Sequence, residues 1–106
     1  MNNVNIIGRL GRDPEMAYFE SGKAKTSFTI AVDSPSKEKK TFWFDVQCWD
    51  KTAEVVGEHC RKGRQVGITG RLEQQTWEDK NGEKHSRVII LADRVDFLAA
   101  PKDAEE

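Results

Sequence analysis

The chain has 106 residues, enough for one domain with a small hydrophobic core. Its 17 Lys and Arg residues are balanced by 18 Asp and Glu residues, and the resulting net charge of −1 excludes a protein that binds nucleic acid through bulk positive charge. No apolar run approaches the ~20 residues that a membrane span needs and the N-terminus does not resemble a signal peptide, so we expect a soluble, cytoplasmic protein.

Alternation of apolar and polar residues predicts five β-strands in the first 100 residues. Four of these strands carry their apolar side chains at even positions: Val4, Ile6 and Leu10; Phe28, Ile30 and Val32; Phe42, Phe44, Val46 and Cys48; and Val66, Ile68 and Leu72. The fifth, Val88 to Leu98, is apolar on both faces in its first half, which is typical of a strand covered on two sides. Turns are predicted at Asp13-Pro14, Ser21-Gly22 and Asn81-Gly82, with Glu15 in the first of them.

Only the segment from Lys51 to Arg61 departs from this alternation. Its apolar residues Ala53, Val56 and Cys60 recur at helical spacing, which predicts a short helix between the third and fourth strands with Asp50 as its N-cap. Three strands, a helix and two strands are the order of an all-β OB-fold, a five-stranded Greek-key barrel. We therefore expect an OB-fold domain over residues 1–100 and a short polar tail over 101–106; an SH3-like barrel, the rival fold, lacks such a helix.

All three tryptophans fall on the face that the alternation leaves polar. Trp43 and Trp49 share the odd face of the third strand with Asp45 and Gln47, and Trp77 occupies the odd face of the fourth. Exposed indole rings along strands are suited to stacking on the bases of a single strand. The alternative is that these tryptophans pack under a loop or in a subunit interface, which explains one of them more readily than all three.

Cationic residues near this face are candidates for phosphate contacts, although any one of them, taken singly, is more simply explained as a solvated surface charge. They are Arg71 on the odd face of the fourth strand, Arg9 and Arg12 beside the first bend, Lys37, Lys39 and Lys40 before Trp43, and Lys80 and Lys84 around the Asn81-Gly82 turn.

The sequence contains no catalytic or metal-ligand constellation, so we expect neither an enzyme nor a cofactor. Two cysteines and two histidines lack the spacing of a zinc site, and no Gly-rich loop precedes the helix. His59 and Cys60 are neighbours on a helix, where their side chains diverge by about 100° and cannot act as a base and a nucleophile.

Two long segments resemble the bacterial single-stranded DNA-binding protein family, and the likeness runs from about Asn3 to Leu98. The first, NVNIIGRLGRDPEMAYFESGKAKTSFTIAV, contains the bend G-x-L-x-x-D-P-E. The second, TFWFDVQCWDKTAEVVGEHCRKGRQVGITGRLEQQTWEDKNGE, contains KG-x-x-V-x-I-x-G-x-L between its aromatic positions.

The resemblance implies sequence-tolerant binding of single-stranded DNA in replication, recombination and repair, base stacking on Trp43, Trp49 and Trp77, a homotetramer, and association with the nucleoid. Phe44 and Asp45 stand where many members carry an interface histidine and a basic residue, and the loop over 34–36 lacks the further aromatic that members often have. The usual acidic tip, through which replication and repair proteins would be bound, is also absent. A primosomal or replication-restart accessory that acts mainly through protein contacts is the alternative function.

Overall fold

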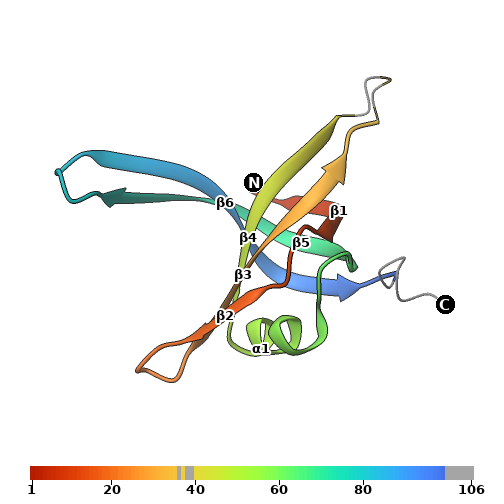
Figure 1. Ribbon diagram of the computed structural model, residues 1–106, viewed down its shortest axis with the longest axis horizontal. Coiled ribbons are helices and arrows are strands. Elements are labelled where there is room, and N and C mark those ends of the chain that lie inside the picture. Colours follow the sequence, from red (N-terminus) through yellow and green to blue (C-terminus); the bar gives the residue numbers. More distant parts are fainter. Residues whose placement is uncertain (36, 38–39, 100–106) are drawn as a thin grey trace.

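A six-stranded sheet and one helix make up the part of the chain that the computed structural model describes, residues 1–35, 37 and 40–99 (Figure 1). In chain order the elements are β1 (Val4–Leu10), β2 (Glu15–Tyr18), β3 (Ala24–Asp33), β4 (Thr41–Trp49), α1 (Asp50–His59), β5 (Gln65–Glu78) and β6 (Lys84–Phe97). The strand order is β1-β5-β6-β4-β3-β2, and a further pairing of β1 with β3 closes the sheet into a ring. This arrangement, with its helix between β4 and β5, confirms the predicted OB-fold.

The five predicted strands are all present, but β2 was not expected. Glu15, predicted in a turn, instead begins a four-residue strand that pairs antiparallel with the start of β3. The predicted Ser21-Gly22 turn makes this possible, because Gly22 adopts a φ of 88° and donates its N–H to the carbonyl of Phe19 at 2.8 Å. β2 is mostly exposed and lacks apolar alternation, so its sequence gave no strand signal.

The buried core confirms most of the predicted apolar face. Its members come from β1, β3, β4, β5, β6, one face of α1 and the C-cap of that helix: Leu10, Ala24, Phe28, Ile30, Val46, Cys48, Ala53, Val56, Cys60, Val66, Ile68, Ile90 and Ala92. Thr26 is also fully buried, and its Oγ1 donates to the carbonyl of Ala53 at 2.6 Å, which ties β3 to the helix. On β6, Ile89 and Ile90 are both buried, as expected for a strand covered on two sides.

The apolar alternation of β4 and β5 extends beyond the core. Phe42, Phe44 and Leu72 were predicted inside, yet they are 48%, 39% and 48% exposed. These residues lie on the β3–β4 and β5–β6 hairpins, which run past the closed ring (Figure 1), so the apolar alternation continues beyond the buried core. Gln47 shows the opposite error, because it was predicted on the polar face and is only 5% exposed.

The helix begins differently from the prediction. Trp49, in extended backbone conformation, occupies the N-cap position without a side-chain capping bond, and Asp50 is the first helical residue rather than the cap. Asp50 has a φ of 56°, a left-handed conformation that Asp tolerates better than most residues. The chain thus turns sharply at the end of β4, which leaves Trp49 at the corner between strand and helix. No helix in the described part of the chain has the length and apolar character needed to cross a membrane.

Candidate nucleic-acid interface

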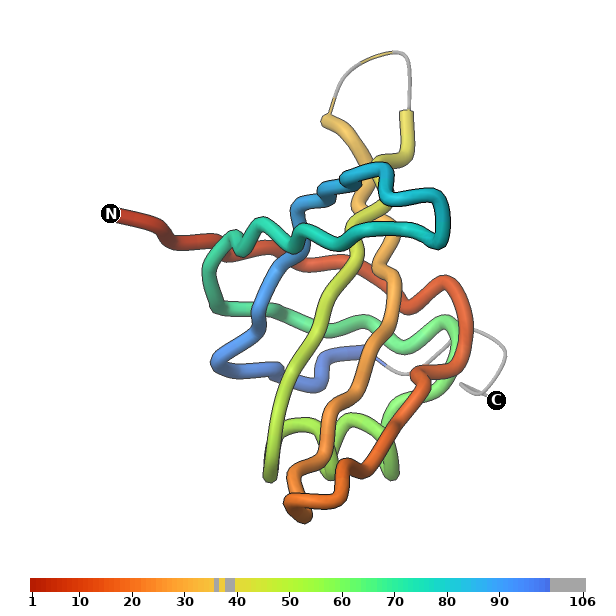
Figure 2. The backbone as a smooth tube through the Cα atoms, turned by 90° about the vertical axis from the view of Figure 1, so that its left-hand side faces the viewer, coloured from red at the N-terminus to blue at the C-terminus, as the bar shows by residue number. Residues whose placement is uncertain are grey.

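The three tryptophans are exposed, as the alternation predicted. Trp43, Trp49 and Trp77 keep 61%, 37% and 47% of their surface accessible. Trp43 and Trp49 lie on β4, whereas Trp77 lies on the distal part of the β5–β6 hairpin, residues 73–89, here called the arm. The arm projects from the closed ring of strands (Figures 1 and 2). The three indoles are therefore distributed over β4 and the arm rather than collected in one pocket.

Trp49 is half of an aromatic pair that carries a positive charge. Its ring stacks on that of Phe19, with centroids 5.5 Å apart and planes inclined by 24°. Lys25, which faces Trp49 across the β3–β4 pairing, places its Nζ 5.7 Å from the Phe19 ring and 5.8 Å from the Trp49 ring. An open pocket of about 450 Å³ adjoins this pair and is lined by Phe19, Ser21, Lys23, Trp49 and Asp50.

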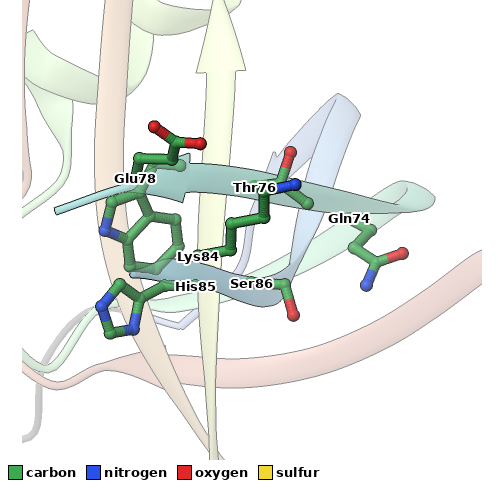
Figure 3. A pocket seen from close by; sticks show the side chains of 7 residues that line it. Gln74, Thr76, Glu78, Lys84, His85 and Ser86 are labelled. Atoms are coloured by element: carbon green, nitrogen blue, oxygen red, sulfur yellow. The ribbon is translucent and has the colours of Figure 1, made fainter. Parts of the chain in front are cut away.

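Trp77 forms a second stacked pair, on the arm. It faces His85 across the β5–β6 pairing, and the two rings stack with centroids 5.5 Å apart. The guanidinium of Arg87 lies 6.0 Å from the centre of the Trp77 ring. A pocket of about 560 Å³ adjoins the pair (Figure 3), and its lining residues are Gln74, Thr76, Trp77, Glu78, Lys84, His85 and Ser86.

The tip of the arm holds His85 in place. Asp79 Oδ2 lies 2.8 Å from His85 Nε2, and Asp79 Oδ1 accepts the backbone N–H groups of Glu83 and Asn81. These hydrogen bonds, that of His85 first, hold the pKa of the Asp79 carboxyl below its ordinary value. The predicted turn at Asn81-Gly82 is confirmed, with Gly82 at a φ of 78°. Ligand-type atoms of Asp79, Glu83 and His85 lie within 4.8 Å of one another, but the hydrogen bonds of Asp79 already explain this arrangement as a braced turn.

Trp43 lies against the bend that follows β1. A Cβ added at Gly11 would come within 2.4 Å of Trp43 Cζ3, so the indole reaches this close to the backbone only because residue 11 is glycine. Trp43 and Trp49 are six residues apart on β4, a distance of about 20 Å in an extended strand. Asp45 and Gln47 lie between them on the same face of β4, and both line a polar groove of about 250 Å³. Its lining residues are Arg12, Asp13, Glu15, Ser27, Phe28, Thr29, Asp45, Val46, Gln47 and Arg87.

The predicted cations separate into two groups. Arg12 lines the groove between Trp43 and Trp49, and Lys84 lines the pocket beside Trp77. Lys80 is exposed at the tip of the arm, and Lys40 directly precedes β4. Lys37 is exposed in the turn between β3 and β4, and Lys39 lies outside the described residues.

Arg9 and Arg71 have contacts away from the tryptophans. Arg9 donates to the carbonyl of Gly63 at 2.8 Å, in the turn that precedes β5. Arg71 Nη1 lies 3.4 Å from Asp93 Oδ1, six residues along β5 from Trp77. Neither of these two contacts is with a stacked aromatic pair, and a role of Arg9 and Arg71 in DNA binding stays a prediction.

Sequence reasoning missed four residues of these sites: Phe19, Lys25, His85 and Arg87. Two of them could have been found by counting outward from the Asn81-Gly82 turn, because this register places Trp77 opposite His85 and Gln75 opposite Arg87. Lys25 could have been found only from the β3–β4 register, which pairs it with Trp49. Phe19 could have been found only from the unexpected β2–β3 hairpin, which brings its ring to Trp49.

The two cysteines are core residues. Burial raises the pKa of Cys48 to about 12 and also raises the pKa of Cys60. Both thiols are free and buried. Neither is therefore suited to act as a thiolate nucleophile at neutral pH.

A sheet closed into a ring, with one helix and with exposed aromatic side chains flanked by cations, defines a nucleic-acid-binding protein of the OB-fold class. Residues 1–98 match the model of the single-strand binding protein family. The chain is 43% identical over 106 residues to the single-stranded DNA-binding protein of Thermosynechococcus vestitus, and this alignment covers 99% of the chain and 88% of that protein. It is 40% identical to single-stranded DNA-binding protein 1 of Synechocystis sp., covering 100% and 90%, and 43% identical to the single-stranded DNA-binding protein of Fusobacterium nucleatum, covering 92% and 66%. The chain belongs to the single-strand binding protein family.

Proposed function

We propose that the protein binds single-stranded DNA with little sequence preference by stacking bases on Trp43, Trp49 and Trp77. The observation that carries this proposal is the exposure of all three indoles on strands, two of them in stacked pairs with a cation near the ring. Such platforms accept any base, because every base offers a flat π-face. The names of the relatives support the same function.

Stacking accounts for more of the proposed affinity than charge does. Base–aromatic stacking contributes about 1–3 kcal/mol per base, whereas a chain of net charge −1 has few cations to spare for phosphates. The cations near the two stacked tryptophan pairs or in the groove are Arg12, Lys23, Lys25, Lys84 and Arg87. In this proposal the protein protects single strands during replication, recombination and repair in the cytoplasm, at the nucleoid, and makes or breaks no bond.

The test is a titration of labelled oligothymidylate, and of a duplex of equal length, followed by fluorescence anisotropy at several salt concentrations. We expect saturable binding of the single strand and much weaker binding of the duplex, whose bases are already stacked. The logarithm of affinity should fall with the logarithm of salt by about 0.7 per phosphate contact, which for two to four contacts per subunit leaves binding at moderate salt. Equal affinity for duplex and single strand would contradict the proposal.

We further propose that copies of the chain assemble, as a homotetramer, through the exposed apolar side chains that the core leaves uncovered. Phe44 is two residues from Val46, which pairs with Ile90, and Ile90 pairs in turn with Leu72. Val88, 58% exposed, precedes Ile90 on the same face of β6. An exposed apolar patch of this kind on one sheet face is typical of an interface. The members of this patch are Phe42, Phe44, Leu72 and Val88.

Phe44→Lys is expected to shift the protein toward smaller assemblies, because it places a charge in this patch. Sedimentation velocity at micromolar concentration measures the change. Thr41→Lys is the matched control, since Thr41 is exposed on the same strand but outside the patch. A wild-type protein that sediments only as the 12.1 kDa monomer would contradict the assembly itself, and an unchanged distribution in Phe44→Lys would contradict the role of the patch.

A further inference from the structure

A partly buried amide pair joins the arm to β4. Gln47 is one of two buried polar residues in the described part of the chain, and its side chain meets that of Gln75 on the arm. Gln75 Nε2 donates to Gln47 Oε1 at 3.0 Å, and Gln47 Nε2 donates to Gln75 Oε1 at 3.5 Å. A buried amide without partners is costly, so this reciprocal pairing favours one position of the arm relative to β4.

The same glutamine is linked to Trp77. Gln75 Oε1 also accepts from Nε and Nη2 of Arg87, both at 3.4 Å. Arg87 in turn lies 6.0 Å from the ring of Trp77 and lines the groove between Trp43 and Trp49. A continuous series of contacts therefore runs from Gln47 on β4, through Gln75 and Arg87, to the indole at the far end of the arm.

The arm needs such a contact because it is a two-stranded ribbon. Its strands pair only with each other from Glu73 opposite Ile89 to Glu78 opposite Lys84. An isolated two-stranded hairpin is only marginally ordered. Without a further contact, Trp77 would have to be fixed in place each time single-stranded DNA binds. Ordering of this kind lowers affinity, and a side chain that fixes the arm beforehand avoids that loss.

We propose that Gln75 is a positioning residue, and that the amide latch formed by Gln47, Gln75 and Arg87 holds the arm so that Trp77 continues the path of Trp43 and Trp49. This inference rests on the proposed function and adds the part that sets where the third stacking platform lies. Gln75 acts through Arg87 and Trp77 and needs no contact with the DNA.

The test compares Gln75→Met with Gln65→Met, combined with Trp77→Ala in a double-mutant cycle. Methionine keeps the length of glutamine and removes the hydrogen bonds of the Gln75 amide to Gln47 and Arg87. Gln65 undergoes the same exchange at the ring end of β5. We expect Gln75→Met to weaken oligothymidylate binding about threefold to tenfold and Gln65→Met to leave it unchanged, with equal far-ultraviolet circular dichroism. We also expect Trp77→Ala to cost far less affinity in the Gln75→Met background than in the wild type. A loss from Trp77→Ala that is equal in both backgrounds would overturn the proposal.

A second measurement does not depend on DNA. In a protein that keeps Trp77 as its single tryptophan, with Trp43→Phe and Trp49→Phe, time-resolved fluorescence anisotropy reports the motion of the arm. We expect Gln75→Met to increase the amplitude of that motion and Gln65→Met not to do so. Unchanged motion would overturn the latch. Increased motion in a protein that binds no single strand would support the latch and reject the proposed function.

Discussion

Trp43→Ala, Trp49→Ala and Trp77→Ala are each expected to weaken the binding of oligothymidylate by about 1–3 kcal/mol. Each change removes one exposed ring on which a base would stack, and none removes a member of the buried core. Anisotropy titration of a labelled oligomer long enough to reach all three positions measures the loss.

The control for these variants is Tyr18→Ala. Tyr18 is 61% exposed, like Trp43, but it lies on the opposite face of the sheet from the tryptophans. Tyr18 pairs with the buried Ala24, whereas its neighbour Ala17 pairs with Lys25, which faces Trp49. We expect its replacement to change affinity little. Loss of cooperative melting in two of the three tryptophan variants would instead make those side chains structural and contradict the stacking role.

Gly70→Ala is expected to destabilise the fold by about 3 kcal/mol, at the upper end of the usual range for overpacking. A Cβ at this position would lie 2.1 Å from the carbonyl oxygen of Leu91 and 2.9 Å from Cα of Ala92. Both are backbone atoms of β6, next to the irregularity in register between Thr69 and Gly70, so neither can move aside without breaking the strand pairing.

Gly67→Ala, on the same strand, is the matched control for Gly70→Ala. The nearest atoms to a Cβ there are side-chain carbons at 3.8 Å, an ordinary contact distance. Chemical denaturation of both variants at one protein concentration measures the difference, the concentration being fixed because assembly adds to apparent stability. We expect Gly67→Ala to equal or exceed the wild type, because alanine loses less entropy on folding than glycine. Equal stabilities of the two variants would contradict the close approach of β5 and β6 at Gly70.

The alternation of residue types predicted the strands and the exposure of the tryptophans because both depend on local periodicity. Ile30, Val46 and Ile68 are buried and Trp43 is exposed, as their positions required. Periodicity alone does not show how far along a strand the covering layer extends. Phe44 has the pattern of a core residue but is 39% exposed, and the β3–β4 hairpin that carries it runs past the closed ring (Figure 1).

The contacts between side chains could not be predicted in the same way, because they depend on cross-strand register and on the path of the chain in space. Trp49 contacts Phe19 only because of the β2–β3 hairpin, and β2 has no apolar alternation from which a strand could be predicted. Gln47 was expected on a polar surface and is buried, since the arm brings Gln75 against it. Arg71 shares the odd face of β5 with Trp77, yet its contact with Asp93 follows from the register shift at Thr69/Gly70.

The central claim, that bases stack on the tryptophans, is tested most directly by intrinsic fluorescence. Indole emission is followed while unlabelled oligothymidylate is added, and the binding curve is compared with that of the anisotropy titration. We expect strong quenching that saturates at the same ratio of DNA to protein, because each stacked base quenches the indole that it covers. Binding detected by anisotropy with unchanged tryptophan emission would contradict the claim.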